Sequence, residues 1–270
     1  MAIDFVILIH AAIIGAIQGI TEWLPVSSTG HMIIAMEFMP VSLNKEFWDF
    51  FLVIVQLFSM LAVLILFFKD INPFVKNKQE RKSVFKLWGK IIIAVLPAAI
   101  IGIIFGDIIE RKLFNVLTVS IALIIYGILF IISDKFNRKN SLTIEGLSYK
   151  KALYIGFFQT LALIPGTSRS GSTILGARTC GMDGESSAKF SFLLAIPTML
   201  GAGLLKCLKC DFSFSLNEWL FLAVGSLVAL IVSVFSVKLL IKAVKKVGLR
   251  PFGVYRIALG VFLILFFTIK

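Results

Sequence analysis

Long uncharged apolar runs, separated by short charged segments, make up most of this chain. A helix needs about 20 apolar residues to cross a bilayer core of about 30 Å. The runs of this length, or nearly so, are Phe50–Phe68, Ile91–Gly106, Leu113–Ser133, Phe190–Leu205 and Trp219–Val237, together with Pro251–Ile269, which only Arg256 interrupts. They lack the alternation of an outer-membrane barrel strand. The pattern therefore predicts an all-α polytopic membrane protein with six full transmembrane helices.

Two further apolar stretches, 5–21 and 152–168, are interrupted by polar or turn-forming residues. The linkers 69–90, 135–151 and 238–250 are rich in Lys and Arg, so the positive-inside rule places all three in the cytoplasm. The stretch from 152 to 185 must then begin and end on the cytoplasmic side. Its first apolar arm of about 13 residues would reach only about 20 Å as a helix. We therefore expect a re-entrant helix-loop-helix hairpin here, and a second one over 3–36 that enters from the outside.

The two expected hairpins resemble each other in sequence. Ile14-Gly15-x-x-Gln18 matches Ile155-Gly156-x-x-Gln159, and the segment 25–30 resembles 165–171. Aligning the prolines with a one-residue gap sets Ser28 opposite Ser168 and Thr29 opposite Arg169. Similar hairpins that enter from opposite faces indicate an inverted-topology repeat. We predict one membrane domain over 1–270, with repeat 1 over about 1–133, a cytoplasmic linker over about 134–150 and repeat 2 over about 150–270.

Composition narrows the function classes. The chain is 59% hydrophobic and 16% charged, whereas a soluble domain is about 45–50% apolar and about 25% charged, so a soluble enzyme is excluded. The net charge of +12 would indicate nucleic-acid binding in a soluble protein, but here it fits basic cytoplasmic loops, and we expect no nucleic-acid partner. Three cysteines form no disulfide framework.

Polar side chains inside membrane segments are functional candidates, and here they gather at the hairpin tips. Gln18 and Glu22 are four residues apart and share a helix face. Beyond Pro25, the residues Ser27 and Ser28 lie where a second helix begins, with free N–H groups that suit an anion. His31 follows Ser28 on the same side of that helix.

The second tip places a fixed cation among hydroxyl groups. Arg169 follows a Pro-Gly turn and is surrounded in sequence by Ser168, Ser170, Ser172 and Thr173. Such a set suits a phosphate cradle. With the groups of the first tip, it can bind and attack a phosphoryl group.

Two polar residues have open interpretations. Gln159 either satisfies backbone groups at a helix break or has a functional role. Arg256 lies one turn into the last helix, where it either snorkels to the membrane interface or forms a structural ion pair.

The motifs resemble those of a known family. Gln18-x-x-x-Glu22 followed by the segment 25–31 looks like the first signature of the undecaprenyl-diphosphate phosphatases, the bacitracin-resistance membrane enzymes. The segment 165–173 looks like the second signature, and 190–197 and 255–257 also resemble family segments. The likeness covers essentially the whole chain.

The resemblance implies hydrolysis of undecaprenyl diphosphate to undecaprenyl phosphate and inorganic phosphate. This would recycle the lipid carrier for peptidoglycan and other cell-wall polymers and confer bacitracin resistance. It also implies a divalent cation, Mg²⁺ or Ca²⁺, and a multi-pass protein of the bacterial plasma (inner) membrane. The active site would open toward the periplasmic or outer face, and the partners would be a prenyl diphosphate lipid and the bilayer.

The resemblance also suggests residue roles. Arg169 would clamp the diphosphate, with hydrogen bonds from Ser27, Ser168, Ser170 and Thr173. Ser28 would be the nucleophile and either His31 or Glu22 the base, although direct attack by His31 is a variant. Gln18 and Glu22 would hold the cation, with Gln18 replacing the carboxylate that the family pattern also allows.

Architecture alone leaves a different function class open. Inverted repeats with broken helices are also common in transporters, so a membrane transporter or lipid flippase with a midplane anion site is the alternative. The oligomeric state is open as well, with a homodimer among the possibilities.

Overall fold

The computed structural model describes residues 4–39, 43–136 and 141–269, and only the backbone at 135 and 136. Residues 1–3 and 40–42 of the predicted first repeat, 137–140 of the predicted linker and residue 270 lie outside the described residues. The helices of the described part are α1 (Phe5–Thr21), α2 (Ser28–Phe38), α3 (Lys45–Leu66), α4 (Phe68–Ile71), α5 (Lys78–Leu113), α6 (Val116–Phe136), α7 (Tyr149–Leu161), α8 (Arg169–Thr179), α9 (Gly184–Leu208), α10 (Leu216–Val247) and α11 (Arg250–Ile269).

Six of these helices are long and apolar enough to cross a membrane, namely α3, α5, α6, α9, α10 and α11. Each contains all or most of one of the apolar runs, so the predicted all-α polytopic architecture is confirmed. Helix α5 is longer than its run because it begins at Lys78, where the Asn77 side chain accepts from two backbone N–H groups. Helix α10 begins with a capping box between Ser215 and Glu218.

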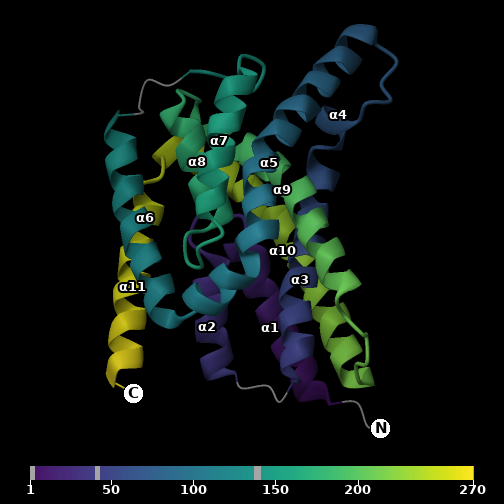
Figure 1. Ribbon diagram of the computed structural model, residues 1–270, viewed down its shortest axis with the longest axis vertical. Coiled ribbons are helices and arrows are strands. Elements are labelled where there is room, and N and C mark those ends of the chain that lie inside the picture. Colours follow the sequence, from purple (N-terminus) through teal and green to yellow (C-terminus); the bar gives the residue numbers. More distant parts are fainter. Residues whose placement is uncertain (1–3, 40–42, 137–140, 270) are drawn as a thin grey trace.

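The remaining polar stretches form two pairs of short helices. Helix α1 turns into α2 through residues 22–27, and α7 turns into α8 through residues 162–168. Helices α2 and α8 have 11 residues each and α7 has 13, too short to span a bilayer core of about 30 Å. The two pairs occupy opposite halves of the molecule, and their turns face each other near its middle (Figure 1). This arrangement agrees with the expected hairpins, whose re-entry into a membrane stays a prediction.

The register of the repeat differs from the alignment based on prolines. Ser27 caps α2 and Ser168 caps α8, and nine residues separate each serine from Gln18 and Gln159 respectively. Ser27 therefore corresponds to Ser168, and the hairpins align without a gap. The prolines mislead because the residue equivalent to Pro25 in this alignment is Gly166, whose φ of 91° is closed to proline, and Pro165 lies one residue earlier in its turn.

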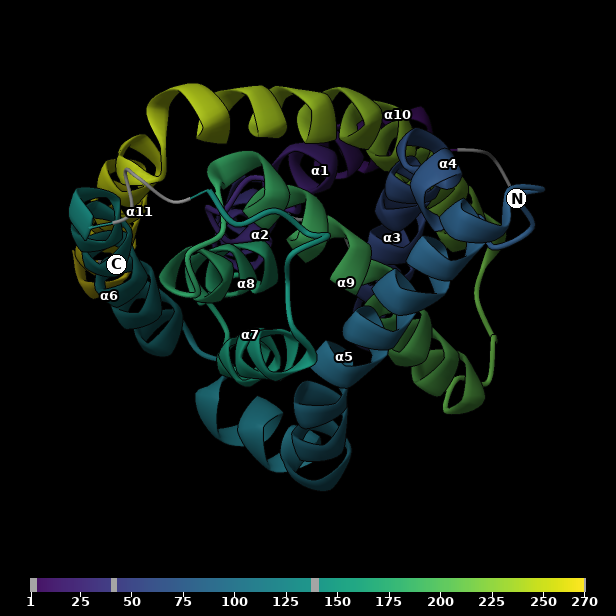
Figure 2. The same cartoon turned by 90° about the horizontal axis from the view of Figure 1, so that it is seen from above.

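The first helix of each short pair packs against a long helix of the other half of the chain. A Cβ atom at Gly15 of α1 would collide with the carbonyl oxygen of Gly225 in α10. A Cβ atom at Gly156 of α7 would collide in the same way with the carbonyl oxygen of Ala94 in α5. Seen from above, α2 and α8 lie in the middle, between α6 and α11 on one side and α3 and α5 on the other (Figure 2). Because each short pair packs against a helix from the other half of the chain, the two turns lie close together.

The largest apolar cluster surrounds α9. Phe190, Phe192, Leu193 and Leu194 are fully buried, and they pack with residues of α5, α7, α8 and α10. Helix α9 is therefore a rigid support behind the second turn.

Candidate functional site

Both turns end in a serine with an unusual backbone conformation. Ser27 has φ 73° and Ser168 has φ 72°, a region that residues other than glycine rarely occupy. Their side chains accept from the N–H groups of Gly30 and Gly171, so each serine caps the helix that follows. Strained residues of this kind cluster at functional sites, and this pair places the N-termini of α2 and α8 at the same region.

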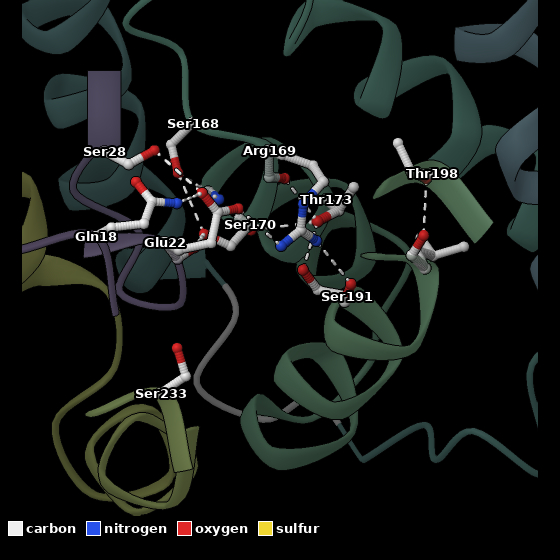
Figure 3. Close-up of polar contacts among 12 residues, drawn as sticks. Gln18, Glu22, Ser28, Ser168, Arg169, Ser170, Thr173, Ser191, Thr198 and Ser233 are labelled. Carbon is white, nitrogen blue, oxygen red and sulfur yellow. Dashed lines mark hydrogen bonds and ion pairs between the residues drawn. The ribbon is translucent and has the colours of Figure 1, made fainter. Parts of the chain in front are cut away.

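Glu22 is the centre of the polar contacts between the turns. Its Oε2 atom accepts from Gln18 Nε2 at 3.0 Å and from Ser28 Oγ at 3.1 Å (Figure 3). Its Oε1 atom lies 3.3 Å from Arg169 Nη2 in an ion pair that joins the two hairpins. The carboxylate is 7% exposed, so these contacts replace water as its partners.

Arg169 is held from three directions. Besides Glu22, its guanidinium donates from Nη1 to the backbone oxygen of Ser191 at 2.9 Å, and it lies 5.6 Å from the centre of the Trp23 ring. These contacts orient the planar fork before any ligand binds, which lowers the entropy cost of binding an anion.

A cavity of about 470 Å³ opens beside this cluster. Its polar wall contains Glu22, Ser27, Ser28, Ser168 and Arg169 from the two turns, together with Gln159 of α7. Its apolar wall follows α5 and α9, and about half of its residues are Gly or Ala. The wall residues are Val95, Ala98, Ala99, Gly102, Ile103, Pro197, Gly201, Ala202 and Leu205. The cavity therefore suits a ligand with one anionic and one apolar end.

His31 lies on α2 but outside the lining of this cavity. Its Nδ1 atom lies 2.8 Å from the backbone oxygen of Ser27, and its Nε2 atom lies 2.6 Å from the hydroxyl oxygen of Tyr255. A carbonyl only accepts, so Nδ1 carries the proton and Nε2 of the neutral ring accepts from Tyr255. The imidazole supports the Ser27 backbone, and both of its nitrogen atoms have partners.

Arg256 is fully buried, which excludes snorkelling, and its hydrogen-bond partners in the described part of the chain are backbone carbonyl groups, not a carboxylate. Its guanidinium donates to the backbone oxygens of Pro25 in the first turn and of Gly166 and Thr167 in the second, at 2.8–3.1 Å. Turns leave carbonyl groups without helical partners, and a guanidinium with five donors can satisfy several at once. Arg256 therefore ties the two turns together beneath the cavity.

A larger cavity of about 1030 Å³ lies at the other end of the second hairpin, near Gly184 of α9 and Arg250 of α11. Several of its charged groups have partners within the chain, since Lys245 pairs with Glu185 and Asp134 accepts from two backbone N–H groups. It also contains hydroxyl, carboxylate and guanidinium groups, but Ser186 Oγ donates to Asp183 and Arg178 pairs with Asp134, so these groups hold the end of the hairpin. The cavity at the turns is the better site for phosphoryl chemistry on a lipid, because Ser28, Glu22 and Arg169 share it with an apolar wall.

The chain matches the family model described as bacitracin resistance protein BacA over residues 11–262. It belongs to the BacA family. It is 51% identical over 260 residues to undecaprenyl-diphosphatase 1 of Clostridioides difficile, covering 95% of each chain. It is 48% identical to the undecaprenyl-diphosphatase of Acetivibrio thermocellus, covering 96% of this chain and 97% of the relative. It is 44% identical to an undecaprenyl-diphosphatase of Enterococcus faecalis, covering 98% of this chain and 99% of the relative. The resemblance seen in the motifs is thus confirmed.

The structure of this BacA-family protein separates the predicted site residues into two groups. Glu22, Ser27, Ser28, Ser168 and Arg169 line the cavity. A second group supports the first from outside the lining: Gln18, His31, Ser170 and Thr173. Gln18 binds Glu22, and Ser170 Oγ donates to the backbone oxygen of Glu22 at 3.2 Å.

Thr173 acts from further away. Its hydroxyl oxygen lies 2.8 Å from the backbone oxygen of Arg169 and 2.6 Å from Ser191 Oγ. Thr173 therefore helps to position Ser191, whose backbone oxygen accepts from the Arg169 guanidinium. The sequence analysis did not single out Ser191, Trp23 or Tyr255 as site residues. For Ser191 and Tyr255 a signal existed, because both lie in segments that resemble BacA-family segments.

Proposed function

We propose that this protein hydrolyses undecaprenyl diphosphate to undecaprenyl phosphate and inorganic phosphate. The observation that carries the proposal is the cavity that holds a hydroxyl paired with a carboxylate, Ser28 with Glu22, beside the oriented cation of Arg169. The activity returns the lipid carrier to the synthesis of peptidoglycan and other cell-wall polymers. It also confers resistance to bacitracin, in keeping with the description of the family.

Ser28 is the proposed nucleophile. Glu22 takes its proton as Oγ attacks the terminal phosphorus, the bond to the bridging oxygen breaks, and undecaprenyl phosphate leaves. A water molecule then hydrolyses the phosphoserine and releases phosphate. Glu22 is favoured over His31 as the base because its Oε2 atom is 3.1 Å from Ser28 Oγ, whereas both ring nitrogen atoms of His31 have other partners.

Positive charge and N–H groups stabilise the transferred phosphoryl group. Arg169 supplies a planar fork for two phosphate oxygens, and Ser27 and Ser168 line the same wall. Helices α2 and α8 both begin at this wall, and the positive ends of their helix dipoles favour the negative charge of the diphosphate.

A divalent cation would be held by Glu22 and Gln18. The donor set fits, because Mg²⁺ commonly takes one or two carboxylates and completes its shell with waters and substrate phosphates, and Ca²⁺ also prefers oxygen ligands. Glu22 is the acidic residue of the cavity wall and is 3.0 Å from the amide of Gln18. Elsewhere in the described part of the chain, Glu46, Cys210 and Asp211 bring three possible metal-ligand atoms within 4.8 Å of one another. These residues are far from the two turns in sequence, so they are not part of this site. When bound, the cation would neutralise phosphate charge.

The apolar wall would receive the prenyl chain. It follows α5 and α9, and a Cβ atom at Gly201 would meet no other atom within 4 Å. Small residues on both helices leave room for a branched hydrocarbon, whose burial is favourable at about 25 cal/mol per Å². The lipid would thus lie with its tail between the helices and its diphosphate at the turns.

The protein would reside in the bacterial plasma (inner) membrane with its site open to the periplasmic or outer face. The six apolar helices make it a multi-pass protein, and the relatives named above are bacterial. The three basic linkers would be cytoplasmic, so the C-terminal ends of α5 and α9, near residues 113 and 208, would lie outside. The cavity lining extends along both helices toward those ends.

The test uses purified protein in detergent, where no membrane separates two compartments. Undecaprenyl diphosphate is added with EDTA, with Mg²⁺ and with Ca²⁺, and released phosphate is measured. We expect release that depends on the cation. No release under any cation condition would favour the transporter or flippase reading, and light scattering on the same sample tests for a homodimer.

A further inference from the structure

Gln159 is a buried amide whose side chain has no internal use. The residue is 2% exposed, and neither Nε2 nor Oε1 has a hydrogen-bond partner in the described part of the chain. The backbone groups at the end of α7 do not need it, because the N–H of Ala162 already donates to the carbonyl oxygens of Gln159 and Thr160. The reading of Gln159 as a helix-break residue is therefore wrong.

Gln18, the equivalent residue of the first hairpin, has the hydrogen-bond acceptor that Gln159 lacks among the described residues. Gln18 is 1% exposed and donates to Glu22 Oε2 one helical turn later. Leu163 occupies the position that corresponds to Glu22 in the second hairpin, and a leucine cannot accept a hydrogen bond. An unpaired buried amide costs free energy, so its persistence points to a partner outside the chain.

The position of Gln159 indicates which ligand group it meets. It lines the same cavity as Ser28 and Arg169. One turn before it, Gly156 lies against Ala94 of α5, and one turn after it, Leu163 lies 3.5 Å from where a Cβ atom at Gly102 of α5 would be. Gln159 therefore lies beside the stretch of α5 that forms the apolar wall, at the border between the polar and apolar parts of the cavity.

We propose that Gln159 binds the phosphate that carries the prenyl chain. This inference rests on the proposed function, in which Ser28 and Arg169 engage the terminal phosphoryl group. The phosphate next to the tail lies at the polar–apolar border, where the Gln159 Nε2 group donates to one of its oxygens. The same contact forms with the prenyl monophosphate product, and it is absent for free inorganic phosphate.

The experiment compares full-length Gln159→Met with wild type in detergent. The probes are a methylene-bridged farnesyl diphosphonate, farnesyl monophosphate and inorganic phosphate. We expect Kd to rise about tenfold for both prenyl ligands, which corresponds to one hydrogen bond to a charged group, and to stay unchanged for inorganic phosphate. Ser226→Ala is the matched control, because it removes another buried polar group without a described partner, outside the cavity lining, and should leave all three Kd values unchanged.

Unchanged binding of the prenyl ligands, or an equal loss for inorganic phosphate, would overturn the assignment. If Gln159→Met does not fold, Gln159→Glu keeps the shape of the side chain, and its added negative charge should weaken binding of both prenyl ligands. Phosphate release by wild type is measured in parallel. Analogue binding that depends on Gln159 without any release would refute the phosphatase function alone, and release without that dependence would refute this inference alone.

Discussion

Arg169 of the second hairpin lies 3.3 Å from the carboxylate of Glu22 in the first, so residues 147 positions apart form one charged pair at the cavity wall. The pair positions the base of the proposed reaction next to its phosphate-binding cation. Its formation depends on the two turns facing each other (Figure 3). Most of the predictions below follow from this relationship.

Replacing Glu22 by Gln should lower kcat by about 100-fold or more, the usual worth of a general base. The amide keeps the shape of the side chain but cannot take the proton of Ser28. Phosphate release from undecaprenyl diphosphate measures the effect. Glu110→Gln, an exposed change at the end of α5, is the control and should behave as wild type. Wild-type turnover by Glu22→Gln would refute the role of Glu22 as base.

Replacing Arg169 by Lys should raise KM by roughly 10- to 100-fold, because an ammonium group keeps the charge but loses the planar fork. It would also lose at least one of the contacts to Glu22 and Ser191 that orient the side chain. Arg111→Lys on the exposed end of α5 serves as the control. Equal KM values for Arg169→Lys and wild type would contradict the bidentate clamp.

Arg256 should act through the backbone of the turns. Arg256→Met leaves the carbonyl groups of Pro25, Gly166 and Thr167 without their donor, and each buried unpaired group costs about 1–3 kcal/mol. We expect a lower thermal midpoint in detergent and a lower kcat, with Arg256→Lys partly restoring both. A Met variant with the wild-type midpoint and kcat would show that the turns do not need this link.

His31 should support the first turn through two hydrogen bonds. Tyr255→Phe removes the bond to Nε2, worth about 1 kcal/mol, and should lower turnover only a few-fold. His31→Ala also removes the bond to Ser27 and should lower turnover further. Both are measured at saturating substrate and cation. Full turnover of His31→Ala would exclude any role for the imidazole, as support, base or nucleophile.

Much of the fold follows from hydropathy, because a bilayer of fixed thickness sets a minimum length for each apolar run. The six long helices appear where the uncharged runs predict them. The interrupted runs around Gln18 and Gln159 form the short helix pairs, whose connecting turns contain Pro25 and Gly166. The charge of the linkers and the similarity of the two tips suffice to predict that polar residues from distant parts of the chain meet.

Contacts between elements were harder to predict. Nothing local shows that Arg256 faces two turns instead of the membrane interface, because its neighbours in sequence are those of an ordinary helix end. The positive φ of Ser27 and Ser168 has no sequence signal either, since serine rarely adopts it. The orientation of His31 toward Tyr255 depends on the packing of α2 near α11, which a helical period cannot specify.

Ser28→Ala tests the central claim most directly. The measurement is phosphate release from undecaprenyl diphosphate by purified protein with cation present, paired with binding of the methylene-bridged analogue. The account predicts that wild type releases phosphate and that Ser28→Ala is slower by about 1000-fold or more, with analogue binding retained. Release by Ser28→Ala at the wild-type rate would contradict it.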